Sequence, residues 1–474
     1  MCGVSVAQVA GPPPDQPAAP EPTATAAAPA ATPPSRADAF AEFRRLFDQK
    51  QYQEAAAAAQ TVVDLTNPKA GTGGEELQVA LMNLATVQYY AGDYLGSETS
   101  YLRVIELIEA TGRMTNPRLA RANAGLARTY HAAKRHELAV ARFERAIALS
   151  RRGEGLFNEE QLPLLEDYAD SLSALDRMQE ALQARRYALR IVERKHGAGS
   201  LQYAHELESI GRWYARSGAY DASRMSLRRA IEIIEATQGP GSPLLVGPLA
   251  GLADCARRQL LDPSQQALAS ADYDRSSLFH DPSVPAPASV SPSTIAADGQ
   301  KALERAVEIA SNRPDPSPAQ VADIRTQLGD WFQWRQQPDK ALPQYQQAWL
   351  AASRADVDGK PLSEALYGRP VLLYYTWPES WDRYRARPAT EAELRNVELE
   401  LTVNPQGRVQ DVKVVADAGD PKLAGQAIRA AETARYRPRM ENGQPVATPG
   451  VRFSQPFYVL LPPVPAPADD KPAK

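Results

Sequence analysis

The sequence LESIGRWYARSGAYDASRMSLRRAIEII, residues 207–234, shows the repeating pattern of this chain most clearly. Leu207, Ile210 and Gly211 follow the i, i+3, i+4 spacing that places residues on one face of a helix. Gly218 then supplies the positive φ that ends a helix, and a second amphipathic run follows. These residues therefore predict two helices joined by a tight turn.

A small residue recurs at the position of Gly211 with a constant spacing of 42 residues. A fixed period of roughly 20–50 residues is the signature of a solenoid, in which each repeat contacts only its neighbours. Solenoids commonly present extended surfaces that bind other molecules. The recurring small residues are Ala85, Ala127, Ala169, Gly211 and Ala253.

Each second helix carries another small residue twelve positions after the first, and a larger residue four positions later. Small residues at a crossing let two helix axes approach to roughly 8–10 Å, and the larger residue fills the adjacent gap. The small residues are Ser97, Ala139, Ala181 and Ser223, and the larger ones are Tyr101, Phe143, Arg185 and Leu227.

The same pattern extends to both sides of these units. A unit with Phe43 fits before them, and a unit with Gly329 and Tyr345 fits after them. The register breaks beyond Ala253, where prolines accumulate that cannot sit inside a helix. We expect seven repeats, of which the sixth is split by an insertion over residues 262–298.

This arrangement of small and large residues resembles the tetratricopeptide repeat (TPR), whose usual unit has about 34 residues. The 42-residue unit resembles the long-helix variant of kinesin light chains. HEAT and armadillo repeats, of roughly 40–47 residues, are the alternative, but they lack the paired small residues. The resemblance implies a mainly α chain built as a helical-hairpin solenoid.

The hydrophobic period changes to two after about residue 390. Residues 397–403 and 408–414 alternate apolar and polar side chains, as half-buried strands do. Between them, residues 404–407 read Asn-Pro-Gln-Gly, which favours a tight turn. This part of the chain therefore predicts a β-hairpin.

A helix and two short motifs follow the hairpin. Asp420 is a preferred N-cap residue before Pro421, and we expect a helix to about residue 434. Residues 436–438 read Tyr-Arg-Pro, residues 442–446 read Asn-Gly-Gln-Pro-Val, and residues 451–460 predict a last strand. This order resembles the C-terminal domain of TonB-type proteins over residues 397–460. The resemblance implies a small α+β domain with an antiparallel sheet and one packed helix.

The TonB resemblance also implies a periplasmic interaction module whose sheet edge can pair with a strand of a partner. Energy transducers of that family carry an N-terminal transmembrane helix, whereas this sequence has no run of about 18 apolar residues. Pro456 interrupts the last strand and cannot donate a ladder hydrogen bond, so we expect it at an edge or bulge. We also expect residues 391–474 to fold alone.

We expect a connector of residues 355–390 between the solenoid of residues 36–354 and the TonB-like domain of residues 391–461. Five aromatic residues lie close together in this connector. We expect them to cover the open apolar face of the last repeat, because terminal repeats need a cap. A ligand platform is the alternative. These residues are Tyr374, Tyr375, Trp377, Trp381 and Tyr384.

Residues 1–35 and 462–474 are expected to be disordered, because such proline-rich segments bury little apolar surface. Three interpretations of the start compete. Cys2 could carry the lipid of a lipoprotein, residues 4–7 could end a truncated secretory signal, or the start could be ordinary disordered chain. We expect a periplasmic protein, membrane-anchored if Cys2 is lipidated. The other cysteine, Cys255, is expected to be a buried, inert thiol.

Composition and motifs give no indication of chemistry. Lys and Arg number 53 against 57 Asp and Glu, a net charge of −4, which is not the basic character of a nucleic-acid-binding protein. No zinc spacing, CxxC, phosphate-binding glycine loop or Gly-X-Ser-X-Gly motif is found in the sequence. We expect no catalytic, metal or cofactor site.

The inner groove of a TPR solenoid is lined mainly by the first helix of each repeat. Six residues could face such a groove, which would suit an extended segment with acidic groups or a free carboxylate. An ordinary solvated surface is the alternative, and Asp170, Glu208 and Asp254 would dilute the positive charge. The six candidates are Tyr89, Arg128, His131, Arg212, Arg216 and Arg257.

We therefore expect a non-enzymatic scaffold of the bacterial cell envelope, binding proteins or peptides through the TPR groove and the TonB-like domain. The alternative is an accessory TonB-like energy transducer for outer-membrane transport, which would need a partner to supply the membrane helix. A hydrolase within the insertion is disfavoured, because that segment offers no nucleophile–base pair.

Overall fold

The computed structural model describes residues 35–66, 74–111, 116–262 and 291–461, except 358, 379, 386 and 418. The expectations for Cys2, for most of residues 1–35, for the centre of the insertion and for the tail lie outside these residues. The chain divides into two compact units, Met1–Met114 and Thr115–Lys474.

The first unit contains two helical hairpins in its described part. Helices α1 (Arg36–Asp48) and α2 (Tyr52–Thr66) pack together, as do α3 (Gly74–Tyr90) and α4 (Tyr94–Glu109). Ser35 caps α1 through a capping box with Asp38.

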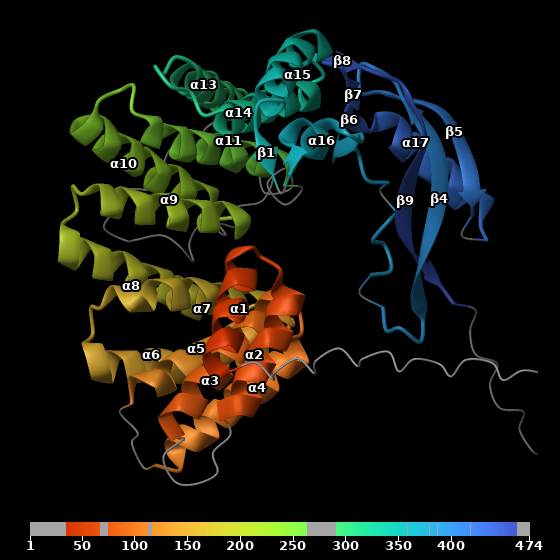
Figure 1. The fold of residues 1–474 in the computed structure, drawn as a ribbon. Helices are drawn as coiled ribbons and strands as arrows, with labels where there is room; N and C mark the ends of the chain where they lie inside the picture. Colours follow the sequence, from red (N-terminus) through yellow and green to blue (C-terminus); the bar gives the residue numbers. More distant parts are fainter. Residues whose placement is uncertain are drawn as a thin grey trace, which may run out of the picture. The chain divides into compact units, whose positions relative to one another are not determined.

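The second unit contains five more hairpins among the described residues (Figure 1). With the two hairpins of the first unit they make the seven repeats that the sequence predicted. The sixth repeat is the split one, and its second helix begins at Pro292. Residues 292–298, which we assigned to the insertion, are therefore helical. The pairs are α5 (Pro117–Ala132) with α6 (His136–Glu154), α7 (Leu162–Ala174) with α8 (Met178–His196), α9 (Leu201–Arg216) with α10 (Tyr220–Gln238), α11 (Val246–Leu261) with α13 (Pro292–Ser311), and α14 (Pro318–Trp334) with α15 (Pro338–Ala352).

The small residues of the repeat lie where the two helices of a hairpin cross. Ala85, Ala127 and Ala169 are fully buried. A Cβ atom built on Gly211 would lie 2.8 Å from Cγ of Leu227, the large residue of the same repeat. This contact is closer than van der Waals packing allows, which confirms the predicted register.

Each fully described turn between paired helices uses a residue with positive φ, whether or not that residue is glycine. Gly92 and Gly218 have φ values of 80° and 79°. Lys134 and Asp176, at the same repeat position, have 61° and 58°. The fold therefore imposes this conformation on residues that rarely adopt it.

Two segments of the connector pack against different parts of the second unit. Helix α16 (Leu362–Tyr367) packs on α15, and its Tyr367 is fully buried in the apolar core of the last repeats. Tyr375 and Trp381 of the aromatic set instead pack on the core of the C-terminal domain, where Tyr375 lies 5.0 Å from Phe453 between ring centroids. The expectation that the aromatic residues cap the last repeat is therefore wrong for Tyr375 and Trp381, and Tyr367 is the aromatic residue of the connector that is buried in the core of the last repeats.

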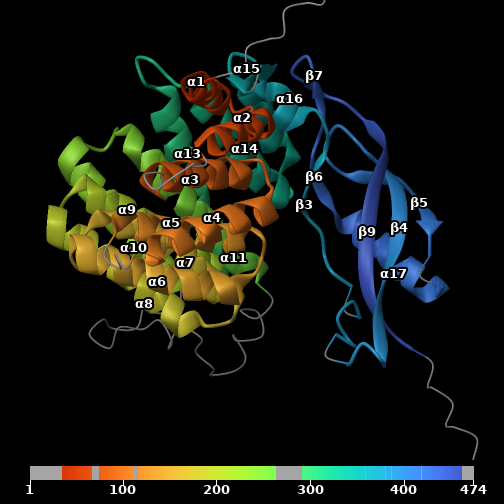
Figure 2. The same cartoon turned by 60° about the horizontal axis from the view of Figure 1, so that its bottom comes forward.

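The C-terminal domain is a three-stranded antiparallel sheet with strand order β5-β4-β9, packed against helix α17 (Figures 1 and 2). Its strands are β4 (Ala392–Val403), β5 (Val409–Ala416) and β9 (Thr448–Leu460). Helix α17 (Pro421–Thr433) begins after Asp420, whose side chain caps it as predicted. The apolar core lies between sheet and helix.

Three short strand pairs complete the second unit in its described part. Strand β3 (Val371–Tyr374) pairs with β6 (Arg435–Arg437), so the C-terminal domain begins before residue 391. The other pairs are β1 (Asp356–Val357) with β2 (Lys360–Pro361), and β7 (Met440–Glu441) with β8 (Gln444–Pro445). Over the ranges that the structure describes, no helix has the length and apolar character needed to cross a membrane.

Candidate binding surfaces

Tyr89, the one candidate groove residue of the first unit, is a half-buried member of an aromatic cluster. It lies on α3, with its ring centroid 5.3 Å from that of Tyr90 and 6.2 Å from that of Tyr94. These two aromatic neighbours are the last residue of α3 and the first residue of α4.

Arg128 and His131 on α5 both contact α7, the first helix of the next repeat. Nε of Arg128 donates to Oδ2 of Asp167 at 2.9 Å. Nδ1 of His131 lies 2.7 Å from Oγ of Ser171, which is fully buried. Neighbouring first helices are thus joined by polar contacts.

Arg212 and Arg216 on α9 each lie near a carboxylate. Arg212 donates to Oε1 of Glu208 at 2.8 Å and to the carbonyl oxygen of Gly247 at 3.1 Å. Nη2 of Arg216 lies 3.7 Å from Oδ1 of Asp170. Burial raises the pKa of Asp170, which the charge of Arg216 opposes.

Arg257 pairs within its own helix, α11. Its Nη2 donates to Oδ1 of Asp254 at 2.8 Å, and Nε of Arg258 donates to Oδ2 of the same carboxylate at 2.6 Å. Burial disfavours the Asp254 carboxylate, but the two arginines lower its pKa.

We call the surface of α5, α7 and α9 that carries these contacts the first-helix face. Of the residues that define it, arginines lie on α5 and α9 and aspartates lie on α7 between them. The three carboxylates expected to dilute the positive charge, at 170, 208 and 254, are direct partners of candidate arginines. This surface therefore does not present a uniformly positive electrostatic field that would attract only acidic groups. The residues of the face are Arg128, His131, Asp167, Asp170, Ser171, Arg212 and Arg216.

Sequence reasoning missed Asp167 and Ser171, although a signal for them existed. They lie two residues before and two after Ala169, the small residue of their repeat. Because the first helices of adjacent repeats are neighbours, residues close to the small position of one repeat face those of the next. Applying that register to both helices would have paired Arg128 with Asp167.

The second candidate surface is the outer edge of β9. This strand is at the end of the sheet, as predicted for Pro456. Pairing of β4 with β9 runs without a shift from Ala392 and Leu460 to Leu401 and Val451, so the expected interruption is absent there. Phe453, Gln455 and Phe457 consequently share the buried face of the strand.

Part of the β9 edge is already covered. The N–H of Tyr458 donates to the carbonyl oxygen of Trp381 at 3.1 Å. The backbone nitrogen of Pro456 faces the same outer edge as that of Tyr458, because the direction alternates from one strand residue to the next. Proline carries no N–H, so this position cannot donate a hydrogen bond to a partner strand. The stretch left for a partner strand therefore lies before residue 456.

The described residues hold no group of three His, Cys, Asp or Glu side chains placed to bind a metal ion. Cys255 is a free, fully buried thiol, and burial raises its pKa. Thiolate is the reactive form of cysteine, so this residue has an inert environment.

The fold and these surfaces define a helical-repeat protein that ends in a small strand-containing domain. Residues 76–152 match the tetratricopeptide repeat family, and residues 391–454 match the family described as Gram-negative bacterial TonB protein C-terminal. The chain is therefore a TPR protein with a TonB-like C-terminal domain. Both modules are of the kind that binds proteins.

Several solved structures are similar to the repeats. The nearly identical TPR-like repeats of a kinesin light chain-type protein from Podosopora anserina align over 42% of this chain and 95% of their own, with 19% identity and a TM-score of 0.39. BtubC (BKLC) from P. vanneervenii aligns over 50% and 97%, with 19% identity and a TM-score of 0.36. Likeness of this degree carries no information on ligands. No curated protein matches the sequence.

Proposed function

We propose that this protein is a non-enzymatic scaffold of the bacterial cell envelope that binds extended protein segments along its first-helix face. The observation that carries the proposal is the set of ion pairs that join one first helix to the next, Arg128 to Asp167 and Arg216 to Asp170. They place donors and acceptors on three successive first helices, α5, α7 and α9.

The ion pairs of this face are suited to exchange with a ligand. The side chains of Arg128 and Asp167 are 40% and 33% exposed, and those of Arg216 and Asp170 are 48% and 39% exposed. Such pairs are worth only about 0–1 kcal/mol, so a ligand group can replace one partner at small cost. A ligand segment with both acidic and basic side chains matches this pattern better than a purely acidic one.

The TonB-like domain would contribute a second contact by pairing a partner strand with the edge of β9. Main-chain hydrogen bonds give such pairing its affinity. The TonB match favours a location in the envelope, where the periplasm is the proposed compartment. Lipidation of Cys2 would anchor the chain to a membrane, and the mass of the N-terminal peptide from an envelope fraction tests it.

Capture from envelope extract tests the scaffold function. The full chain should retain specific proteins, and the double variant Arg128→Ala with Arg216→Ala should lose them. Arg229→Ala is the matched control, because Arg229 forms an ion pair with Glu232 on the second helix α10. Retention of the same proteins by the double variant, or their equal loss from the control, contradicts a role for the first-helix face.

A further inference from the structure

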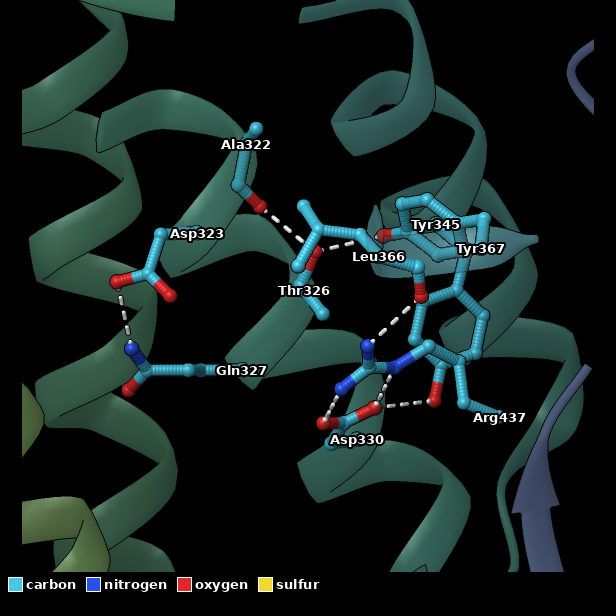
Figure 3. A network of polar contacts seen from close by, with 9 residues as sticks. All are labelled: Ala322, Asp323, Thr326, Gln327, Asp330, Tyr345, Leu366, Tyr367 and Arg437. Carbon is cyan, nitrogen blue, oxygen red and sulfur yellow. Dashed lines mark hydrogen bonds and ion pairs between the residues drawn. The ribbon is translucent and has the colours of Figure 1, made fainter. Parts of the chain in front are cut away.

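The last repeat and the C-terminal domain are joined by a buried ion pair between residues 107 positions apart (Figure 3). Asp330 lies on α14, and Arg437 is the arginine of the Tyr-Arg-Pro motif on β6. Nε of Arg437 donates to Oδ1 of Asp330 at 2.9 Å, and Nη2 donates to Oδ2 at 2.6 Å. Only 12% of the Arg437 side chain and 23% of the Asp330 side chain are exposed.

Further hydrogen bonds surround this pair. Nη1 of Arg437 donates to the carbonyl oxygen of Leu366 on α16 at 3.0 Å. The hydroxyl of Tyr345 donates to Oδ1 of Asp330 at 2.9 Å, and Tyr367 bonds Thr326 at 2.6 Å (Figure 3). Burial alone would lower the pKa of Arg437, but its bonds to Asp330 raise it, so the guanidinium stays charged.

Two turns of the C-terminal domain touch the same repeat. Nε2 of Gln333 on α14 donates to the carbonyl oxygen of Gln406 at 2.6 Å. A Cβ on the next residue, Gly407, would lie 2.0 Å from the carbonyl oxygen of Tyr436 and 2.2 Å from that nitrogen, and its φ is 71°, so this turn requires glycine. A Cβ on Gly443 would lie 3.3 Å from the ring of Trp349 on α15. Both turns, identified from the sequence as parts of the TonB-like pattern, therefore face the solenoid.

We propose that the last repeat is a built-in docking partner for the C-terminal domain, held in a single register by the Asp330–Arg437 pair. This docking does not depend on what the first-helix face binds. A buried, bidentate ion pair fixes geometry more than it adds stability, and it is costly to break by removing one partner. Docking through α14, α16 and both turns leaves the stretch of β9 before residue 456 for other molecules.

Hydrogen exchange measured by mass spectrometry on the full chain tests this proposal. Arg437→Met and Asp330→Asn should each accelerate exchange in residues 362–367, 404–407 and 442–445 by at least about tenfold, because each leaves a buried group unpaired. Helices α5 to α9 should be unchanged. Arg437→Lys, which keeps the charge without the two-pronged contact, should give a smaller acceleration at the same segments.

Arg435→Met is the matched control, two residues away on the same strand. Arg435 donates to the carbonyl oxygens of Thr433 and Ala434 at 3.0 and 2.8 Å, within its own domain. Its loss should loosen the end of α17 and spare residues 362–367. Exchange at the three docking segments that is unchanged in Arg437→Met and Asp330→Asn overturns the proposal, as does equal loosening by Arg435→Met.

Discussion

At the scale of single residues, the helix crossings decide which side chains the repeat tolerates. Gly211→Ala places a Cβ 2.8 Å from Leu227 and should destabilise the protein by about 1–3 kcal/mol through overpacking. Gly153→Ala on α6 meets nothing within 4 Å and should stabilise by up to about 1 kcal/mol, because alanine favours the helix. Thermal unfolding measures both; a shift of the same sign for the two variants would contradict the register.

A buried carboxyl predicts a dependence of stability on pH. Burial raises the pKa of Glu206 on α9 above its ordinary value of 4.5, and its Oε1 has no partner within the described residues. A group with a raised folded pKa contributes stability below its unfolded pKa, and this contribution is lost as pH rises through the folded value.

Glu206→Gln should therefore make the free energy of unfolding less sensitive to pH above about 4.5. Glu232→Gln, in an exposed ion pair on α10, serves as the control. Denaturant unfolding between pH 4 and 8 should show a flatter profile for Glu206→Gln only; parallel profiles for all three proteins would count against the burial effect.

At the scale of elements, the turns of the repeat store a small conformational cost. Lys134 joins α5 to α6 with φ of 61°, a conformation that costs an L-residue roughly 1–2 kcal/mol. Lys134→Gly should therefore raise the melting temperature, whereas Lys134→Ala should not, since alanine keeps the Cβ. Equal melting temperatures for the two variants would show that the turn is not strained.

We expect an independently folding C-terminal domain to include strand β3. Residues 391–474 lack β3 and the aromatic residues that pack beside Phe453. A fragment of residues 370–461 should accordingly give a better dispersed amide spectrum than one of residues 391–474. Equally dispersed spectra would mean that β3 is an accessory to a domain already stable without it.

Elements with local signals were predictable from the sequence, and elements that depend on distant contacts were not. The crossing at Gly211 and the cap at Asp420 are written in short-range spacing, so both were found. Nothing near Tyr367 marks it as the cap of the solenoid, because its partners Thr326 and Tyr345 come from other helices. The pairing of Arg437 with Asp330 likewise has no local signature.

The repeat formed by α7 and α8 has an arginine where other repeats have a large apolar or aromatic residue, and the sequence alone did not explain it. Arg185 occupies the large-residue position filled elsewhere by Tyr101, Phe143 or Leu227, and its side chain is 1% exposed. Its Nη1 lies 3.4 Å from Oε1 of Glu166, and its Nη2 donates to Oγ of Ser209 at 2.8 Å. An arginine is tolerated there because these polar partners lie on the two neighbouring first helices, α7 and α9.

At the scale of the whole molecule, the second unit combines a face of alternating charge with a sheet domain docked on the last repeat. Photo-cross-linking in intact cells tests the binding function most directly. A photoreactive residue replacing Arg216 on the first-helix face should form adducts with envelope proteins. The same residue replacing Arg229 on α10 should form few. Adducts from position 229 alone, or none from position 216, would contradict the account.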